Sequence, residues 1–255
     1  MRPSRSTRPA PPTTAEVRAA VFGRVRSVGP EYAMLAAFVA IGANLFDLAS
    51  LPVPGAGSNG GFVAAAIVRI VAVFLATYAI LRRMAETPAP FRPGAAMARF
   101  FALALLLAVL SGLVTAGGAR LLGGDEMDLA SRWLVTLALA ALWGVVTIRL
   151  VGWPAVLANG EPFGALPAAF RRLRGCGGRL ALVFLQLVLP FAAIHLALNL
   201  IGAALPLPGG ALAALALVDG VVSAIQLVLA AALAAVAMRI AADRAGALRD
   251  APAGG

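Results

Sequence analysis

Four ionisable side chains lie inside long apolar runs of this sequence, and they are the residues best placed to do chemistry. They are Asp47, Arg69, His195 and Asp219. A charged side chain at the centre of a bilayer costs roughly 2.5–3.5 kcal/mol on insertion scales, so each of them needs a partner or a function. Histidine changes charge within the physiological pH range, which makes His195 the member suited to a proton relay.

Further polar residues follow these four at helical spacing. Asn44 and Asp47 are three residues apart, and His195 and Asn199 are four apart. Because such spacings bring side chains onto one helix face, we expect one intramembrane polar layer in the outer leaflet. Its members are Asn44, Asp47, Arg69, His195, Asn199, Asp219, Ser223 and Gln226.

This polar layer has two interpretations. In the first, its members pair with one another and lock neighbouring helices together, a common role for intramembrane polar groups. In the second, they form a proton or cation relay, or a polar cavity for a small solute, with His195 as the titrating member. As a specific hypothesis, Arg69 bridges Asp47. Over the whole layer, two aspartates and one arginine leave one negative charge, which a protonated His195 would cancel.

Composition indicates the elements that must position this layer. The chain has 255 residues, of which 61% are hydrophobic and 13% charged, whereas a soluble domain carries about 25% charged residues. An ordinary water-soluble domain is therefore excluded. We expect an all-α polytopic membrane protein with six transmembrane helices in one bundle, because six runs approach the roughly 20 residues that a crossing needs. The predicted spans cover residues 32–51, 62–81, 100–116, 133–151, 180–204 and 211–240.

The distribution of arginine predicts how the chain threads the membrane. All 21 basic residues are arginines, and eighteen of them fall in alternate segments on one side of the predicted spans. Because basic residues favour the cytoplasmic side, both termini are predicted to be cytoplasmic, in a bacterial inner membrane. The domain organisation is then a basic cytoplasmic tail with an interfacial helix (1–30), a six-helix domain (31–241) and a cytoplasmic tail (242–255).

Two arginine-rich segments on that side read as amphipathic surface helices. Residues 19–29 and 167–177 share a Phe, two arginines and a Gly at matching positions, which is compatible with an internal duplication. Their apolar residues recur at helical spacing opposite the arginines, so the expected partner is the bilayer and its anionic headgroups rather than nucleic acid. The predicted membrane-surface basic residues are Arg24, Arg26, Arg171, Arg172 and Arg174.

Residues 160–190 carry a family resemblance. Ala169, Phe170 and Arg171, followed by Leu173, Arg174 and Gly175, precede a long apolar run with a late proline. This stretch resembles bacterial six-helix membrane proteins related to the membrane domain of glycerophosphodiester phosphodiesterases, whose fifth span follows an A-[FW]-R-h-x-R-G segment. Arg172 and the absence of tryptophan depart from that pattern. The resemblance implies an all-helical inner-membrane protein without an established activity.

The remaining residue types limit the chemistry. One cysteine permits no internal disulfide, one histidine permits no His-rich metal site, and the absence of lysine excludes lysine-dependent catalysis. We therefore expect no cofactor, no metal and no catalytic residues. The leading hypothesis is a non-catalytic subunit or organiser of the inner membrane that contacts another membrane protein. The alternatives are a small transporter or channel that uses the polar layer, and a lipid-modifying membrane enzyme.

Overall fold

The structure is a computed structural model that describes residues 10–49, 60–87, 89–118, 121, 127–147 and 150–249. Throughout these residues the regular elements are helices, which confirms the all-helical class for the described part of the chain. In chain order they are α1 (Thr14–Ser27), α2 (Pro30–Ala49), α3 (Gly60–Met84), α4 (Ala95–Gly112), the π-helical turn η1 (Leu113–Gly117), α6 (Leu129–Thr147), α7 (Trp153–Ala158), the 3₁₀ turn η3 (Phe163–Ala165), α8 (Leu166–Arg172), α9 (Gly177–Leu187), α10 (Leu189–Ala204) and α11 (Gly209–Arg249).

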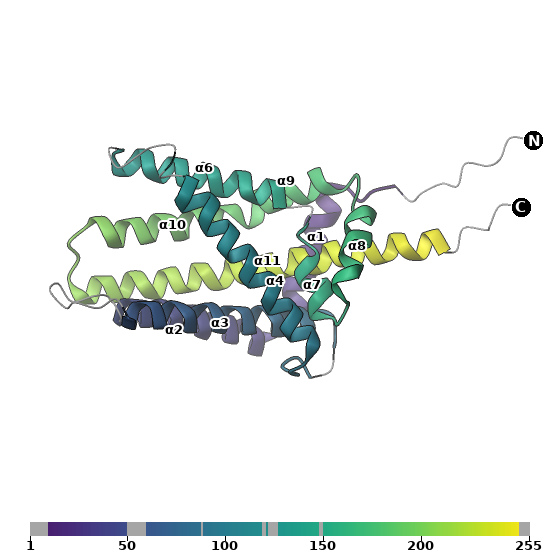
Figure 1. The fold of residues 1–255 in the computed structure, drawn as a ribbon, viewed down its shortest axis with the longest axis horizontal. Helices are drawn as coiled ribbons and strands as arrows, with labels where there is room; N and C mark the ends of the chain where they lie inside the picture. Colours follow the sequence, from purple (N-terminus) through teal and green to yellow (C-terminus); the bar gives the residue numbers. More distant parts are fainter. Residues whose placement is uncertain are drawn as a thin grey trace, which may run out of the picture.

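The longest helix, α11, forms the axis of the molecule (Figure 1). Helices α2 and α3 run along one side of it, and α9, α10 and α6 lie on the other side, while α4 crosses the bundle obliquely. Three helices, α1, α7 and α8, lie across the bundle at the end where both termini emerge. The bundle therefore has transverse helices at one end, and within the described residues the short connection 205–208 between α10 and α11 lies at the other.

Two bends separate helices that the sequence joins closely. The axes of α1 and α2 differ by 90°, and the break falls at Gly29, whose φ of 85° lies in the left-handed region that favours glycine. The axes of α9 and α10 differ by 41°. Pro190 explains this second bend, because proline cannot donate the hydrogen bond that would continue the helix. The predicted single helix over 180–204 is thus two helices.

The best-packed core lies at the end covered by α1, α7 and α8. Tyr78 and Leu81 of α3, Phe100 of α4 and Leu157 of α7 are fully buried there around α11. On α11 itself, residues 231–237 are all buried, and five of the seven are alanine. Small side chains let neighbouring helices approach closely, which explains why this apolar stretch attracts so many partners.

Large apolar side chains are exposed along the rest of the bundle. Phe38 of α2 is 79% exposed and Leu134 of α6 is 57% exposed. Soluble monomers rarely expose contiguous apolar patches of this kind. Two helices, α4 over Ala95–Gly112 and α11 over Gly209–Gly246, are long and apolar enough to cross a membrane, and α1 with α2 and α9 with α10 qualify as bent pairs. The described residues therefore contain two to four candidate spans.

The predicted spans and the helices differ in extent. Helix α11 has 41 residues and continues to Arg249, well past the predicted end of the sixth span at residue 240. The third span, 100–116, is divided between α4 and the π-helical turn η1. Hydropathy reports how far the apolar side chains extend, whereas a helix continues as long as its backbone hydrogen bonds do.

Two helix starts are capped by side chains. At α1 the Oγ1 of Thr13 accepts from the Glu16 backbone N–H, and a Glu16 carboxylate oxygen accepts from the Thr13 N–H at 2.6 Å, which completes a capping box. At α6 the Asp128 carboxylate accepts from the Ser131 N–H at 2.9 Å and from its hydroxyl at 2.7 Å. These hydrogen bonds hold the pKa of Glu16 and the pKa of Asp128 below the ordinary carboxyl values.

Candidate functional site

Five polar side chains from three helices meet where α2, α10 and α11 pack together. Asn44 comes from α2, His195 and Asn199 come from α10, and Asp219 and Ser223 come from α11. We call these five residues the polar cluster. The two α10 residues lie one helical turn apart, as do the two α11 residues, so each pair presents its side chains on one face, as the spacing predicts.

Asp219 is the centre of the polar cluster. Its side chain is 8% exposed, and both of its carboxylate oxygens accept hydrogen bonds. The Nδ1 of His195 lies 2.6 Å from Oδ1, and the amide nitrogen of Asn44 donates to Oδ2 at 2.8 Å. The Asn199 amide donates to the same Oδ2 at 3.3 Å. A buried carboxylate is thereby supplied with donors from α2 and α10, which ties both helices to α11.

Three polar side chains lie within hydrogen-bond distance of the His195 ring: Asp219 and Ser223 at Nδ1, and the Asn199 amide at 3.3 Å from Nδ1 and 3.4 Å from Nε2. Its Nδ1 lies 2.6 Å from Asp219 Oδ1 and 3.1 Å from the Ser223 hydroxyl. In a Ser-His-Asp triad the carboxylate and the hydroxyl occupy opposite ring nitrogens, so that the imidazole can pass a proton between substrate and serine while the carboxylate orients it. The geometry of the polar cluster does not match that arrangement. With Asp219 ionised, Nδ1 carries the hydrogen, because a carboxylate can only accept.

The two asparagines have second partners on the backbone. Asn199 donates to the carbonyl of His195 at 2.8 Å, and Asn44 reaches the carbonyl of Ala216 at 3.4 Å. The Asn199 amide therefore joins its own helix, α10, to the carboxylate, whereas both partners of the Asn44 amide lie on α11. Every member of the polar cluster has at least one hydrogen-bond partner within the described residues.

A close approach of two helix backbones allows Asn44 to reach Asp219. Gly220 follows Asp219 directly on α11, and a Cβ added there would lie 2.6 Å from the Cα of Ile41 on α2. Real Cβ atoms do not approach other atoms so closely, so only glycine fits at this crossing. The sequence analysis did not select Gly220, although its position beside an intramembrane aspartate was the available signal.

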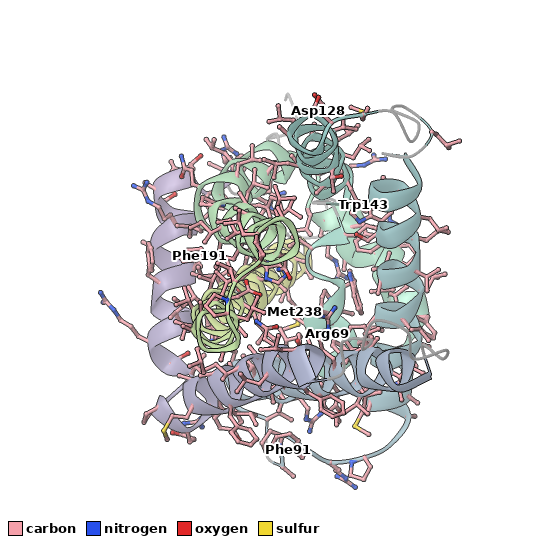
Figure 2. All side chains as sticks on the ribbon, turned by 90° about the vertical axis from the view of Figure 1, so that its left-hand side faces the viewer. Arg69, Phe91, Asp128, Trp143, Phe191 and Met238 are labelled. Atoms are coloured by element: carbon pink, nitrogen blue, oxygen red, sulfur yellow. The ribbon has the colours of Figure 1, made fainter. Side chains whose placement is uncertain are left out.

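The structure describes the side chains of two further members of the predicted polar layer, Arg69 and Gln226. No hydrogen bond of the cluster involves Arg69 or Gln226 in the described part of the chain. Arg69 is on α3, labelled in Figure 2 on the side that faces the middle of the bundle, and it takes part in an interaction of its own. The side chain of Asp47 lies outside what the structure describes, so its pairing with Arg69 stays a prediction.

The arginines at the transverse-helix end serve largely as helix caps. Arg24 donates to the last carbonyl of α3, that of Met84, at 2.6 Å. Arg82 donates to the carbonyl of Ala158, the last residue of α7, at 3.0 Å, and Arg99 donates to the carbonyl of Gly160, just after that helix, at 2.8 Å. These bonds satisfy carbonyls that a helix end leaves without partners, and they place positive charge where the helix dipole is negative.

Arg244 supplies the corresponding cap for α8. One of its terminal nitrogens donates to the carbonyls of Arg172 and Arg174, at 2.8 Å each. Of the predicted membrane-surface arginines, Arg26, Arg171 and Arg174 are exposed, whereas Arg24 and Arg172 are half-buried. The sequence analysis did not anticipate this capping role, because a cap depends on which helix end lies nearby in space.

Metal-binding residue types are sparse around the polar cluster. His195 and Asp219 are its two such residues, and nowhere in the described residues do three or more His, Cys, Asp or Glu side chains gather. In comparisons with known proteins, no family model, no curated protein and no solved structure matched this chain. The resemblance carried by residues 160–190 therefore stays a prediction.

Proposed function

We propose that this chain is a non-catalytic integral protein of the bacterial inner membrane, acting as a subunit or organiser of other membrane components. In this proposal six helices span the bilayer, both termini are cytoplasmic, and α1, α7 and α8 lie at the cytoplasmic surface against anionic headgroups. The candidate spans, the exposed apolar surface of the bundle and the eighteen arginines on one side support the placement.

The observation that carries the non-catalytic role is the engagement of Asp219 by three side chains from α2 and α10. Its two carboxylate oxygens accept from His195, Asn44 and Asn199, and its side chain is buried. A carboxylate that holds helices together is expected to accept hydrogen bonds from side chains of those helices in this way. We therefore assign the polar cluster a structural role, which is to hold α2, α10 and α11 in one arrangement.

One observation favours transport as a second candidate. The side chain of His195 is 37% exposed although it contacts the buried Asp219. A histidine that is accessible on one side and paired to a carboxylate on the other can accept and release a proton, which is the chemistry that a proton-coupled transporter needs. The catalytic alternative has less support, because Asp219 and Ser223 share one nitrogen of His195.

Reconstitution separates the two candidates. The purified protein is placed in liposomes that carry a pH-sensitive dye, and an imposed pH gradient is followed over time. The proposed role predicts decay at the rate of protein-free liposomes, for the parent and for His195→Gln alike. Decay that is faster with the parent, and that slows with His195→Gln but not with the matched change Gln226→Ala, would establish transport instead.

Placement in the membrane is tested independently. Single cysteines are introduced at Arg18 and at Pro208 in a Cys176→Ser background, and intact cells are treated with a membrane-impermeant maleimide. We expect labelling at position 208, in the loop before α11, and protection at position 18 on α1. The reverse pattern would show that the proposed orientation is wrong.

A further inference from the structure

A groove runs between the transverse helix α1 and the C-terminal part of α11. Its volume is about 490 Å³, within the roughly 300–1,000 Å³ of typical small-ligand sites. Helix α1 crosses α11 at the end of the molecule that also carries α7 and α8 (Figure 1), and no residue of the polar cluster lines the groove.

Charges of both signs line this groove. Arg24 and Glu16 come from α1, and Arg239 and Asp243 come from α11. Glu16, Arg239 and Asp243 are exposed, and Arg24 is half-buried. Among the described residues no ion pair of 4.0 Å or less joins any two of these four charges. Two cations and two anions therefore surround one space without neutralising each other directly.

Part of the lining of the groove is apolar, which suits a ligand with an apolar part. Val236 and Ile240 of α11 line it beside the charges. On the α1 side of the groove, Gly23 leaves open space, since an added Cβ would meet nothing within 4 Å. Arg24 donates one N–H to the Met84 carbonyl, and a guanidinium carries five such donors, so most of its donor capacity remains for a ligand.

We propose that this groove binds the headgroup of a zwitterionic aminophospholipid, a phosphate diester that carries a primary ammonium. Arg24 and Arg239 bind the phosphate, and Glu16 and Asp243 bind the ammonium. Guanidinium groups match phosphate oxygens in geometry as well as in charge. The balance of two cations and two anions favours a headgroup without net charge, because an anionic headgroup would face the two carboxylates. This inference rests on the proposed placement of α1 at the membrane surface.

Native mass spectrometry of the full chain in detergent tests the proposal. The protein is titrated with phosphatidylethanolamine and, separately, with phosphatidylglycerol, and bound lipid is counted by mass. We expect the parent to prefer phosphatidylethanolamine. We expect the Arg239→Gln variant to bind phosphatidylethanolamine about tenfold more weakly than the parent, because a charge-assisted hydrogen bond is removed. Asp243→Asn is expected to abolish the preference between the two lipids. Parent-like binding by both variants would overturn the proposal.

A steric variant probes the same groove without changing its charge. Gly23→Phe fills the open space and also raises the helix propensity of α1, so we expect it to abolish phosphatidylethanolamine binding while α1 stays folded. Gly178→Phe on α9 is the matched control, because a Cβ there also meets nothing within 4 Å and Gly178 does not line the groove. Equal binding by these two variants would place the lipid elsewhere.

Further experiments distinguish a lipid from a soluble ligand, and a failure of the headgroup site from a failure of the membrane placement. Soluble phosphoethanolamine carries the same charges without acyl chains, and we expect it to compete only at concentrations at least about a hundredfold higher, because it cannot bury apolar surface. Competition at concentrations equal to those of the lipid would identify a soluble ligand instead. Absence of bound lipid in a protein that needs detergent to stay dispersed would refute the headgroup site alone. Stability in detergent-free buffer would refute the membrane placement itself.

Discussion

Removal of the Asp219 carboxylate is expected to loosen the contact of α2 and α10 with α11. The change Asp219→Ala deletes three hydrogen bonds, from His195, Asn44 and Asn199. Hydrogen bonds between helices within a membrane contribute about 0.6 kcal/mol each on average. Three of them give about 2 kcal/mol, which lowers the folding equilibrium constant about thirtyfold.

This estimate applies because none of the three donors loses its last partner. Asn199 keeps the His195 carbonyl at 2.8 Å, His195 keeps the Ser223 hydroxyl at 3.1 Å, and Asn44 keeps the Ala216 carbonyl at 3.4 Å. The larger penalty of an unsatisfied buried donor is thereby avoided. A double-mutant cycle with Asn44→Ala is expected to give a coupling free energy of about 0.6 kcal/mol, the share of that one bond.

The measurement is reversible unfolding in lipid–detergent bicelles by titration with a denaturing detergent, followed by tryptophan fluorescence. Gln226→Ala is the control, because Gln226 lies on the same helix, is half-buried and takes no part in the hydrogen bonds of the polar cluster. We expect the control to change the unfolding free energy by less than about 0.5 kcal/mol. If Asp219→Ala and Gln226→Ala shift the midpoint equally, the polar cluster does not hold the helices together.

Three further predictions concern the contacts around the polar cluster and the transverse helices. Gly220→Ala places a Cβ 2.6 Å from the backbone of Ile41 and is expected to lower the free energy of unfolding by about 1–3 kcal/mol in the same assay. Its control is Gly246→Ala, whose Cβ meets nothing within 4 Å and which should not destabilise the protein. Arg244→Met removes the donor shared by the Arg172 and Arg174 carbonyls and should accelerate amide hydrogen exchange at the end of α8, an effect that Arg18→Met on α1 should lack. The lowered pKa of Glu16, caused by its hydrogen bonds with Thr13, means that its support of α1 is present above the ordinary glutamate pKa and is lost as the pH falls through the lowered value. The protection factor of the amides in the first turn of α1, which is the exchange rate of the unstructured chain divided by the observed rate at the same pH, should therefore stay high at pH 5 and fall only in more acidic buffer, and Thr13→Ala should move that fall to higher pH.

Part of the candidate site could be predicted from residue type and spacing. His195 with Asn199, and Asp219 with Ser223, each lie one helical turn apart, and their common faces follow from helix geometry alone. Asn44 and Asp219 were both assigned to the predicted polar layer, and the structure joins their side chains by a hydrogen bond. Spacing along one helix could not show that Arg69 and Gln226 lie outside the polar cluster, because that depends on how each helix is rotated against its neighbours.

The division between sequence and tertiary structure follows from the range of the forces involved. Composition and apolar run length determined by themselves that the described chain is helical, since this property depends on local backbone chemistry. The bends near Gly29 and Pro190 also have local causes, but the sequence predicted one continuous span over 180–204, and only the structure revealed the bends. Only the folded arrangement decided that Gly220 lets α2 approach α11 and that three donors converge on Asp219. It also decided which arginines cap the ends of other helices, namely Arg24, Arg82, Arg99 and Arg244. Each of these contacts joins residues far apart in the chain, and their distances are set by how the helices pack rather than by the order of the residues.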